Sequence, residues 1–192
     1  MWTHLRSAVV LVVVMTVLTG LAYPLAVTGL ADLTFPWQAK GSLIEKDGHV
    51  VGSALIGQKF DNPAYFHGRP SAAGEGYDAA NSGGSNLAPS SRKLVDDVAA
   101  RVAAERKANP EEKGPVPADL VTASASGLDP HISPATASYQ VKRVAAYRHV
   151  PVEEVRKLVT EHTEGRELGL LGEPRINVLK LNLALDERWP MK

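Results

Sequence analysis

The segment SGLDPHIS (126–133) contains serine, aspartate and histidine, which are the residue types of a hydrolytic triad. In a triad an aspartate orients a histidine that takes the proton of a serine hydroxyl, and geometry in space matters more than short spacing. Ser126 or Ser133 with His131 and Asp129 would supply these groups. Residues this close on a proline-containing turn rarely share one proton path, and the sequence has no nucleophile-elbow pattern. We therefore favour a turn in which Asp129 and Ser133 bond the local backbone, with a serine hydrolase as the alternative.

Histidine and glycine suggest two other chemistries, metal binding and nucleotide binding. The six histidines, at positions 4, 49, 67, 131, 149 and 162, form no helical i, i+4 pair and no HExxH motif. The absence of cysteine excludes a Cys-based zinc site, a cysteine nucleophile and a disulfide. The glycine-rich NSGGSN (81–86) lacks the Lys-Ser/Thr pair of a phosphate-binding loop. We therefore expect no catalytic, cofactor-binding or metal-binding residues.

Nucleic-acid binding is a third chemistry to weigh, because residues 133–165 have the outline of two helices with a tight joint. The charged side chains of this pair nearly cancel, with five positive and four negative. The whole chain has 21 Lys and Arg against 21 Asp and Glu, so it offers no phosphate-seeking surface. Two packed core helices explain the pattern better, and we expect no nucleic-acid partner. A membrane-tethered helix-turn-helix regulator would need this part of the chain in the cytoplasm.

Docking to another protein is the remaining chemistry, and it is suggested by the long loop 61–91. This loop is rich in Gly, Ser and Asn and shows no hydrophobic period, yet it carries aromatic and basic side chains. Loops of this length are usually functional or disordered. Tyr65, Phe66 and Tyr77 could anchor a protein interface, or they could fix the loop to its own core. Arg69 suits a partner carboxylate or exposed carbonyl groups.

The elements that must position these residues follow from turn signals and periodicity, and together they predict an α+β domain. Asp47-Gly48 predicts a hairpin turn within residues 42–60, because both residues accept a positive φ. Pro and Ser signals then predict three helices. These run from Ser90 or Ser91 to Asn109-Pro110, from Ser133-Pro134 to about Arg148, and from Pro151 onward, with a proline-rich connection at 109–120. Alternating leucines predict a strand over 175–185.

One apolar segment precedes this domain. Arg6 and Asp32 bracket an uncharged run, residues 7–31, which is long enough for a transmembrane helix of about 20 residues. The competing interpretation is a cleaved signal peptide, whose apolar region usually runs about 7–15 residues and ends at a small-residue site. This run is longer and its small residues make a poor cleavage site, so we favour a retained helix. Its small residues Gly20, Ala22 and Gly29 are candidates for packing against other membrane helices.

The orientation of the helix follows from positive charge, which favours the cytoplasmic side. His4, Arg6 and the amino terminus precede the run, whereas Asp32 follows it. We therefore predict a cytoplasmic segment at 1–6, a transmembrane helix at 7–31 and an extracytoplasmic α+β domain at 32–192. An exported hydrolase anchored by this helix stays the alternative function.

Several motifs, in this order, resemble the KdpC family, the small subunit of the bacterial Kdp potassium-transporting ATPase. They follow one N-terminal span and read YFHGRPSA, NSGGSNLAPSS, SGLDPHISP and INVLKLNLAL, and the likeness covers almost the whole chain. The resemblance implies a non-catalytic accessory subunit of a high-affinity, ATP-driven potassium uptake complex in the bacterial inner membrane. It implies three protein partners: a channel-like potassium-selective subunit, a P-type ATPase subunit and a small membrane peptide.

The family is described as a catalytic chaperone that raises the ATP affinity of the ATPase subunit. A domain outside the membrane cannot easily reach nucleotide inside, so the resemblance and the predicted topology together imply an indirect effect on ATP. Within this framework we expect the loop and the neighbouring turn to dock onto the channel-like subunit. The expected docking residues are His67, Arg69, Asn81, Ser82, Ser85, Asn86, Asp129 and His131.

Overall fold

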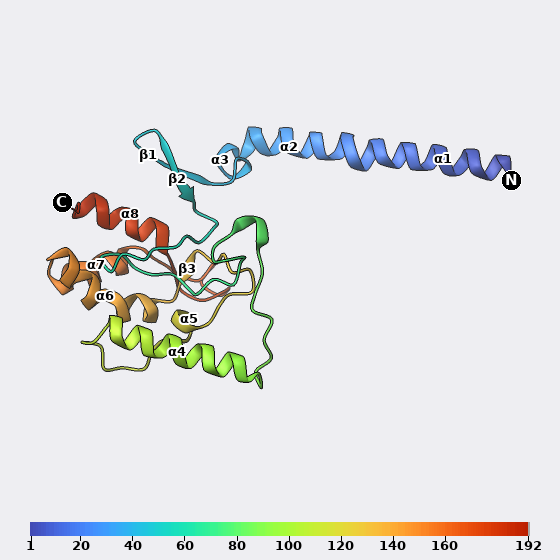
Figure 1. Ribbon diagram of the computed structural model, residues 1–192. Helices are drawn as coiled ribbons and strands as arrows, with labels where there is room; N and C mark the ends of the chain where they lie inside the picture. The colour runs from blue at the N-terminus through green and yellow to red at the C-terminus, as the bar shows by residue number, and fades with distance from the viewer. Residues whose placement is uncertain (192) are drawn as a thin grey trace. The chain divides into compact units, whose positions relative to one another are not determined.

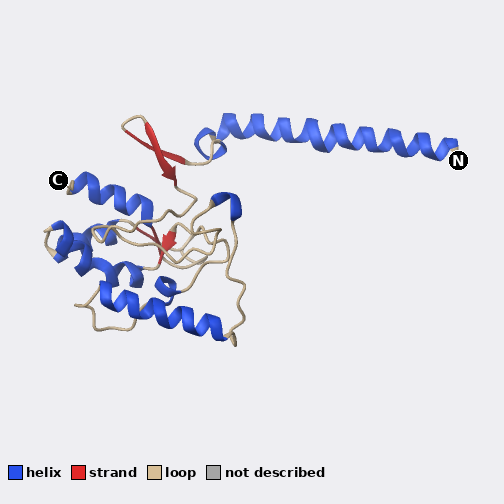
Figure 2. Ribbon diagram, viewed as in Figure 1, coloured by secondary structure: helices blue, strands red, loops and turns tan. Residues whose placement is uncertain are grey.

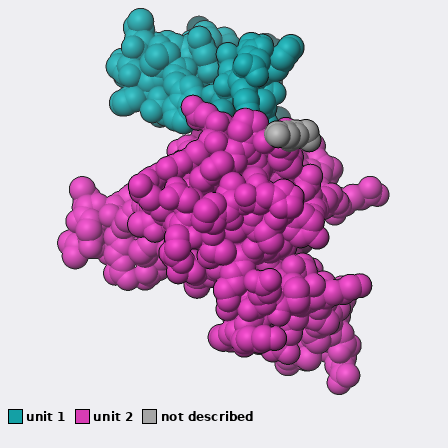
Figure 3. Space-filling view, turned by 90° about the vertical axis from the view of Figure 1, so that its left-hand side faces the viewer, with its two compact units in different colours: residues 1–51 teal, residues 52–192 magenta. Residues whose placement is uncertain are grey.

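The computed structural model describes residues 1–191, and the chain divides into two compact units (Figure 3). The first unit covers residues 1–51 and the second begins at Gly52.

The first unit begins with one continuous helix from Trp2 to Thr34 (Figure 1). It consists of α1 (Trp2–Val17), a π-helical turn (Leu18–Ala22) and α2 (Tyr23–Thr34). The π-helical turn ends two residues before Pro24, whose ring has no N–H to donate and would crowd the carbonyl four residues earlier. The helix has a mean hydropathy of 2.3 over its best window, and none of that window is buried. It is long and apolar enough to cross a membrane.

A short helix and a hairpin follow, and the last two residues of the hairpin, Gly52 and Ser53, already belong to the second unit. The helix α3 (Pro36–Ala39) is followed by β1 (Leu43–Lys46) and β2 (His49–Ser53), which form a two-stranded sheet. Asp47 and Gly48 have φ values of 53° and 76°, so both occupy the left-handed region that the tight turn requires. The predicted hairpin is confirmed, but its second strand ends at Ser53 instead of continuing toward residue 60.

The core of the second unit lies between three helices and a small antiparallel sheet (Figure 2). The helices are α6 (Pro134–Arg148), α7 (Val152–Glu161) and α8 (Val178–Arg188). The sheet has the order β3 (His131–Ile132), β5 (Arg175–Asn177), β4 (Thr163–Glu164). The side chains in the core are mostly aliphatic, and the fully buried ones include Phe66, Ile132, Val144, Val155, Ile176, Leu181 and Leu185.

The start of α6 confirms the local prediction. Ser133 is the N-cap, and its hydroxyl oxygen accepts a hydrogen bond of 3.1 Å from the Thr136 N–H. Pro134 occupies the first turn, where a missing N–H costs nothing. The helix ends at Arg148, and α7 then begins after Pro151 with two glutamates in its first turn.

The predicted strand over 175–185 is wrong beyond its first three residues. The chain is a strand only from Arg175 to Asn177, and α8 follows directly. The Asn177 side chain accepts a hydrogen bond of 3.1 Å from the Lys180 N–H, which caps the helix. Val178, Leu181 and Leu185 then lie buried at helical spacing. Leucine favours helix, so the alternating leucines contribute two faces of a helix instead of one face of a strand.

Two further helices lie outside this core. The helix α4 (Arg92–Ala108) follows Ser91 and ends before Asn109, as predicted, and none of its side chains is fully buried. The short helix α5 (Ala118–Val121) overlaps the end of the segment 109–120, which was expected to be a connection. Arg101 of α4 donates a hydrogen bond of 3.1 Å to the Val121 carbonyl, which fixes α4 beside α5.

Candidate functional site

The long loop 61–91 is fixed by tertiary contacts, although its only regular element is a 3-10 turn at Ala79–Asn81. Phe66 is fully buried in the core. The next residue, His67, donates its backbone N–H to Gln140 Oε1 at 2.8 Å, and its carbonyl accepts from Gln140 Nε2 at 3.1 Å. Gln140 lies on the buried face of α6 and is itself fully buried. The aromatic side chains therefore fix the loop to its own core, which was one of the two interpretations of the sequence.

Two arginines of α6 hold the residues just before Phe66. Arg143 donates to the carbonyls of Pro63 and Tyr65, the latter at 3.0 Å. Arg148 donates to the Ala64 carbonyl at 2.9 Å and pairs with Asp186 at 2.8 Å. Burial lowers the pKa of Arg143 to about 10. Both guanidinium groups are thus committed inside the domain, so they cannot serve as phosphate contacts of a helix-turn-helix.

The loop meets the turn 122–132 through an ion pair between Arg69 and Asp129. Arg69 Nη1 lies 3.0 Å from Asp129 Oδ2, and about a quarter of each side chain is exposed. The same guanidinium donates to the carbonyls of Thr122 and Ala123 at 3.3–3.4 Å. Asp129 Oδ1 accepts the His131 backbone N–H at 2.9 Å, and its distance to His131 Nδ1 is 3.6 Å. We call Arg69, Asp129 and His131 the Arg69 cluster.

The charge state of Asp129 follows from these contacts. Burial raises the pKa of Asp129, but hydrogen bonds from His131 and Arg69 outweigh the burial, so the pKa lies below its ordinary value. Asp129 is therefore ionised at neutral pH and keeps the Arg69 guanidinium in place. Because both partners are partly exposed, the cluster presents charged and hydrogen-bonding groups at the surface.

Further along, the loop and the turn approach so closely that only glycine fits. The Ser71 hydroxyl donates to the Gly127 carbonyl at 2.6 Å, and the Gly83 N–H donates to the Ser126 carbonyl at 2.8 Å. Gly127 has a φ of 68°, and a Cβ there would lie 2.6 Å from the Ala73 nitrogen. The two segments therefore form one surface, held together independently of the Arg69–Asp129 pair.

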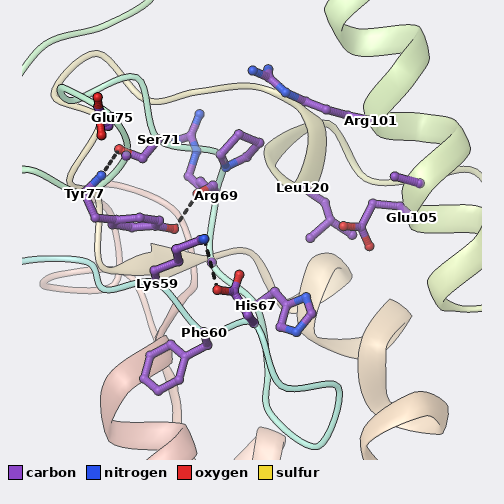
Figure 4. A pocket seen from close by; sticks show the side chains of 15 residues that line it. Lys59, Phe60, His67, Arg69, Ser71, Glu75, Tyr77, Arg101, Glu105 and Leu120 are labelled. Atoms are coloured by element: carbon purple, nitrogen blue, oxygen red, sulfur yellow. Dashed lines mark hydrogen bonds and ion pairs between the residues drawn. The ribbon is translucent and has the colours of Figure 1, made fainter.

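A pocket of about 330 Å³ lies beside the Arg69 cluster (Figure 4). The Tyr77 hydroxyl donates to the Arg69 carbonyl at 2.5 Å on one wall, and Glu105 projects from α4 on another. Burial raises the pKa of Glu105, against smaller opposing effects of Arg143 and Asn109. Burial and the nearby Arg143 guanidinium lower the pKa of His67. The pocket wall between the loop and α4 thus favours the neutral carboxylic acid of Glu105 and the neutral imidazole of His67.

The structure brings some of the predicted docking residues together and separates others. Arg69, Asp129 and His131 are adjacent, whereas His67 is half-buried and lines the pocket. The remaining loop residues are exposed and lie beyond the 71–77 turn, and they are Asn81, Ser82, Ser85 and Asn86. In the apolar helix the three small residues are all exposed, two of them within the π-helical turn: Gly20, Ala22 and Gly29.

The serines of the possible triad are engaged in local structure. The Ser126 hydroxyl accepts the Leu128 N–H at 3.1 Å. The Ser133 hydroxyl donates to Asp119 at 3.1 Å while it caps α6. Within residues 1–191 no hydrogen bond joins His131 to either serine. The same residues contain no group of three His, Asp or Glu side chains that could hold a metal ion.

Sequence reasoning missed the side chains that fix the loop. Gln140, Arg143 and Arg148 of α6 and Asn182 of α8 are polar residues on buried helix faces. A polar residue among apolar ones at helical spacing was the available signal, because a buried polar group needs a partner. The sequence did not indicate that the partner would be the backbone of residues 63–67.

Comparison with known proteins identifies the family of this chain. The family described as "KdpC: K+-transporting ATPase, c chain" matches residues 5–187. The chain belongs to the KdpC family. The potassium-transporting ATPase KdpC subunit of Rhodospirillum rubrum is 62% identical over 187 residues, which cover 97% of each chain. The KdpC subunit of Dechloromonas aromatica is 59% identical over 97% of this chain and 98% of its own, and that of Koribacter versatilis is 56% identical over 98% and 96%.

The matched region includes the apolar helix from residue 5 onward, the loop 61–91 and the Arg69 cluster. The KdpC resemblance inferred from the sequence motifs is therefore confirmed over nearly the full chain.

Proposed function

We propose that this chain is an accessory, non-catalytic subunit of an ATP-driven potassium uptake complex, and that it is needed for assembly and stability of that complex. The observation that carries the proposal is the match to the KdpC family over residues 5–187. Two structural features support it. The helix Trp2–Thr34 has the length and hydropathy of a membrane anchor, and the second unit presents a loop–turn surface held together by hydrogen bonds and the Arg69–Asp129 ion pair.

The proposed location is the inner membrane of a bacterium, with residues 1–6 in the cytoplasm and residues 32–192 outside. Arg6 near the start of the helix and Asp32 near its end support this orientation. In this topology the domain does not contact cytoplasmic ATP, so any rise in the ATP affinity of the ATPase subunit is indirect. The route would be the apolar helix, through Gly20, Ala22 and Gly29, or the channel-like subunit.

The proposed partners are a channel-like potassium-selective subunit, a P-type ATPase subunit and a small membrane peptide. The Arg69 cluster and the exposed loop residues Asn81, Ser82, Ser85 and Asn86 form the proposed docking surface for the channel-like subunit. The cluster suits this role because its groups are partly exposed and held in fixed positions by the loop contacts. A preformed surface binds without a large ordering cost.

Co-purification from native membranes tests the proposal. The C-terminus is tagged, the membranes are solubilised in mild detergent, and the accompanying proteins are identified by mass spectrometry. We expect a multi-spanning ATPase subunit and a channel-like subunit in stoichiometric amounts. A tagged, unrelated single-span protein of similar size is the control. Recovery of the tagged chain alone, or in the soluble fraction, would overturn the proposal.

A further inference from the structure

The connection between β4 and β5 carries three exposed leucines, Leu168, Leu170 and Leu171, which we call the leucine tip. Leu168 is 90% exposed and Leu170 is 80% exposed. They are the two most exposed large apolar side chains among the described residues of the second unit. Single exposed apolar residues need no explanation, but a contiguous group marks an interaction site.

The backbone of the tip adds an independent observation. Leu168 has a φ of 52° and Gly169 a φ of 74°, so both residues occupy the left-handed region. Asparagine followed by glycine is the low-energy pair for such a turn, whereas a leucine with positive φ is strained. Leu168 therefore destabilises the free chain in two ways, because its positive φ strains the backbone and its apolar side chain is exposed to water. Strained backbone of this kind is concentrated at functional sites, where the surrounding structure holds it in place.

The tip is held in one shape by its own base. Glu167 and Leu171 exchange two backbone hydrogen bonds of 2.9 Å. Arg166 pairs with Glu173 at 2.7 Å, and Arg175 pairs with Glu167 at 3.0 Å and with Glu164 at 3.2 Å. These charged residues form a collar beneath the leucines. The leucines are therefore presented on a preorganised turn.

The collar indicates which kind of surface the tip fits. Segments that bind an anionic membrane surface carry unpaired Lys or Arg, often with aromatic side chains. Here both arginines of the collar are paired with glutamates, and residues 164–175 contain no aromatic side chain and no lysine. An apolar centre surrounded by a polar rim, here of two arginines and three glutamates joined in ion pairs, is the arrangement of a protein interface.

From these observations we propose that the leucine tip docks into an uncharged aliphatic groove on another protein subunit of the same potassium-transporting ATPase. The inference rests on the proposed function, because that function supplies the partner. It adds a second contact surface, formed by residues outside the Arg69 cluster and with the opposite chemistry.

A turn-preserving variant tests the tip without disturbing the fold. Leu168→Asn combined with Leu170→Ser removes the apolar surface and places a favoured residue in the left-handed position. We expect the thermal midpoint of the purified full chain to stay the same or rise. We expect the ATPase subunits recovered per tagged chain to fall at least about tenfold, because two buried leucines contribute more than that factor to affinity. Val95→Asn, at an exposed position of α4, is the matched control and should change neither the thermal midpoint nor the recovery of ATPase subunits.

Cross-linking identifies the occupant directly. The chain has no cysteine, so Leu170→Cys gives a single attachment site for a photoreactive maleimide. In the whole complex we expect a cross-link to one ATPase subunit, and we expect no contact with spin-labelled lipid in nanodiscs that hold the subunit alone. If such lipid quenches a fluorophore attached at position 170, the tip belongs to the bilayer and the proposal is overturned.

The outcomes separate this inference from the proposed function. If the unsubstituted chain recovers no ATPase subunits, both fail. If it recovers them, and the leucine variant recovers them equally well without a cross-link at position 170, only the docking role of the tip is wrong.

Discussion

Asn182 and Phe66 exchange two hydrogen bonds in the centre of the second unit. The Phe66 N–H donates to Asn182 Oδ1, and Asn182 Nδ2 donates to the Phe66 carbonyl, both at 2.9 Å. The side-chain amide thereby acts toward the loop as a neighbouring strand would, and Gln140 does the same for His67. Two helices thus supply the hydrogen bonds that a sheet would supply, which explains how a loop with little regular structure keeps a fixed shape.

Loss of the Asn182 amide should destabilise the domain. Asn182→Ala leaves the buried N–H and carbonyl of Phe66 without partners, so we expect the free energy of unfolding to fall by about 2–5 kcal/mol. Denaturant unfolding of the detergent-solubilised chain measures it. Asn81→Ala, at an exposed loop position, is the control and should cost less than about 1 kcal/mol. Equal effects at the two sites would show that the amide does not fix the loop.

The ion pair between the buried Arg148 and the partly exposed Asp186 should behave as one unit. The Arg148 side chain is 1% exposed and also lies 4.7 Å from the centre of the Tyr65 ring. Arg148→Ala leaves Asp186 without its cation, and we expect a loss of about 3–5 kcal/mol in unfolding free energy. In a double-mutant cycle, Asp186→Ala should lower the unfolding free energy much less in the Arg148→Ala background than in the unsubstituted chain. Additive losses would contradict the coupling.

Arg69 should matter more for the complex than for the fold. Arg69 and Asp129 are partly exposed, so we expect Arg69→Ala to lower the unfolding free energy by only about 1 kcal/mol. We expect the same substitution to reduce recovery of the complex strongly, because it removes the cation from the proposed docking surface. Arg92→Ala, which breaks an exposed ion pair on α4, serves as the control. Normal recovery and potassium transport with Arg69→Ala would rule out the docking role.

His67 should make the domain sensitive to acid. Burial and Arg143 lower its pKa in the folded state below the usual 6.5, so the unfolded chain binds the proton more readily. Stability from neutral His67 is therefore present above about pH 6.5 and is lost as the pH falls toward the folded-state pKa. Thermal midpoints between pH 8 and pH 5 should decline less in His67→Gln than in the unsubstituted chain. The exposed His49→Gln is the control, and parallel curves for His67→Gln would refute the argument.

Glu105 should give the domain a pH dependence of stability opposite in sign to that of His67. Burial raises its pKa in the folded state above the usual 4.5, so the folded chain binds the proton more readily. Stability from protonated Glu105 is therefore full below about pH 4.5 and is lost as the pH rises through the folded-state pKa. Glu105→Gln should raise the thermal midpoint at pH 7.5, and the gain should shrink on acidification. A destabilised Glu105→Gln variant at pH 7.5 would mean that the carboxylate is needed beside Arg143.

Local signals were sufficient for several elements of this fold. Ser133 and Pro134 predicted the start of α6, and Asp47-Gly48 predicted the hairpin, because caps and tight turns depend on neighbouring residues. The strand predicted over 175–185 is wrong because the prediction relied on leucine alternation alone and did not consider Asn177 as a helix cap. The stronger signal was the capping residue followed by Val178, Leu181 and Leu185 at helical spacing.

The candidate site could be predicted only in part. The turn around Asp129 and the polar loop were identified by composition, and Arg69 was singled out for its chemistry. The partners of the loop lie 73 residues away at Gln140 and 116 residues away at Asn182. Pairing across such separations depends on the packing of α6 against α7 and of α7 against α8, which one sequence does not reveal.

The distance along the chain between the loop and α8 also determines when the loop can take its shape. Synthesis proceeds from the N-terminus, so residues 61–91 leave the ribosome when Asn182, which is 116 residues beyond Phe66, has yet to be added. Phe66 has no amide partner in α8 until then, and non-local contacts of this kind form late. An interrupted chain would carry the apolar helix without an ordered loop. Only a chain synthesised through α8 can offer the docking surface, so assembly would select finished subunits over fragments.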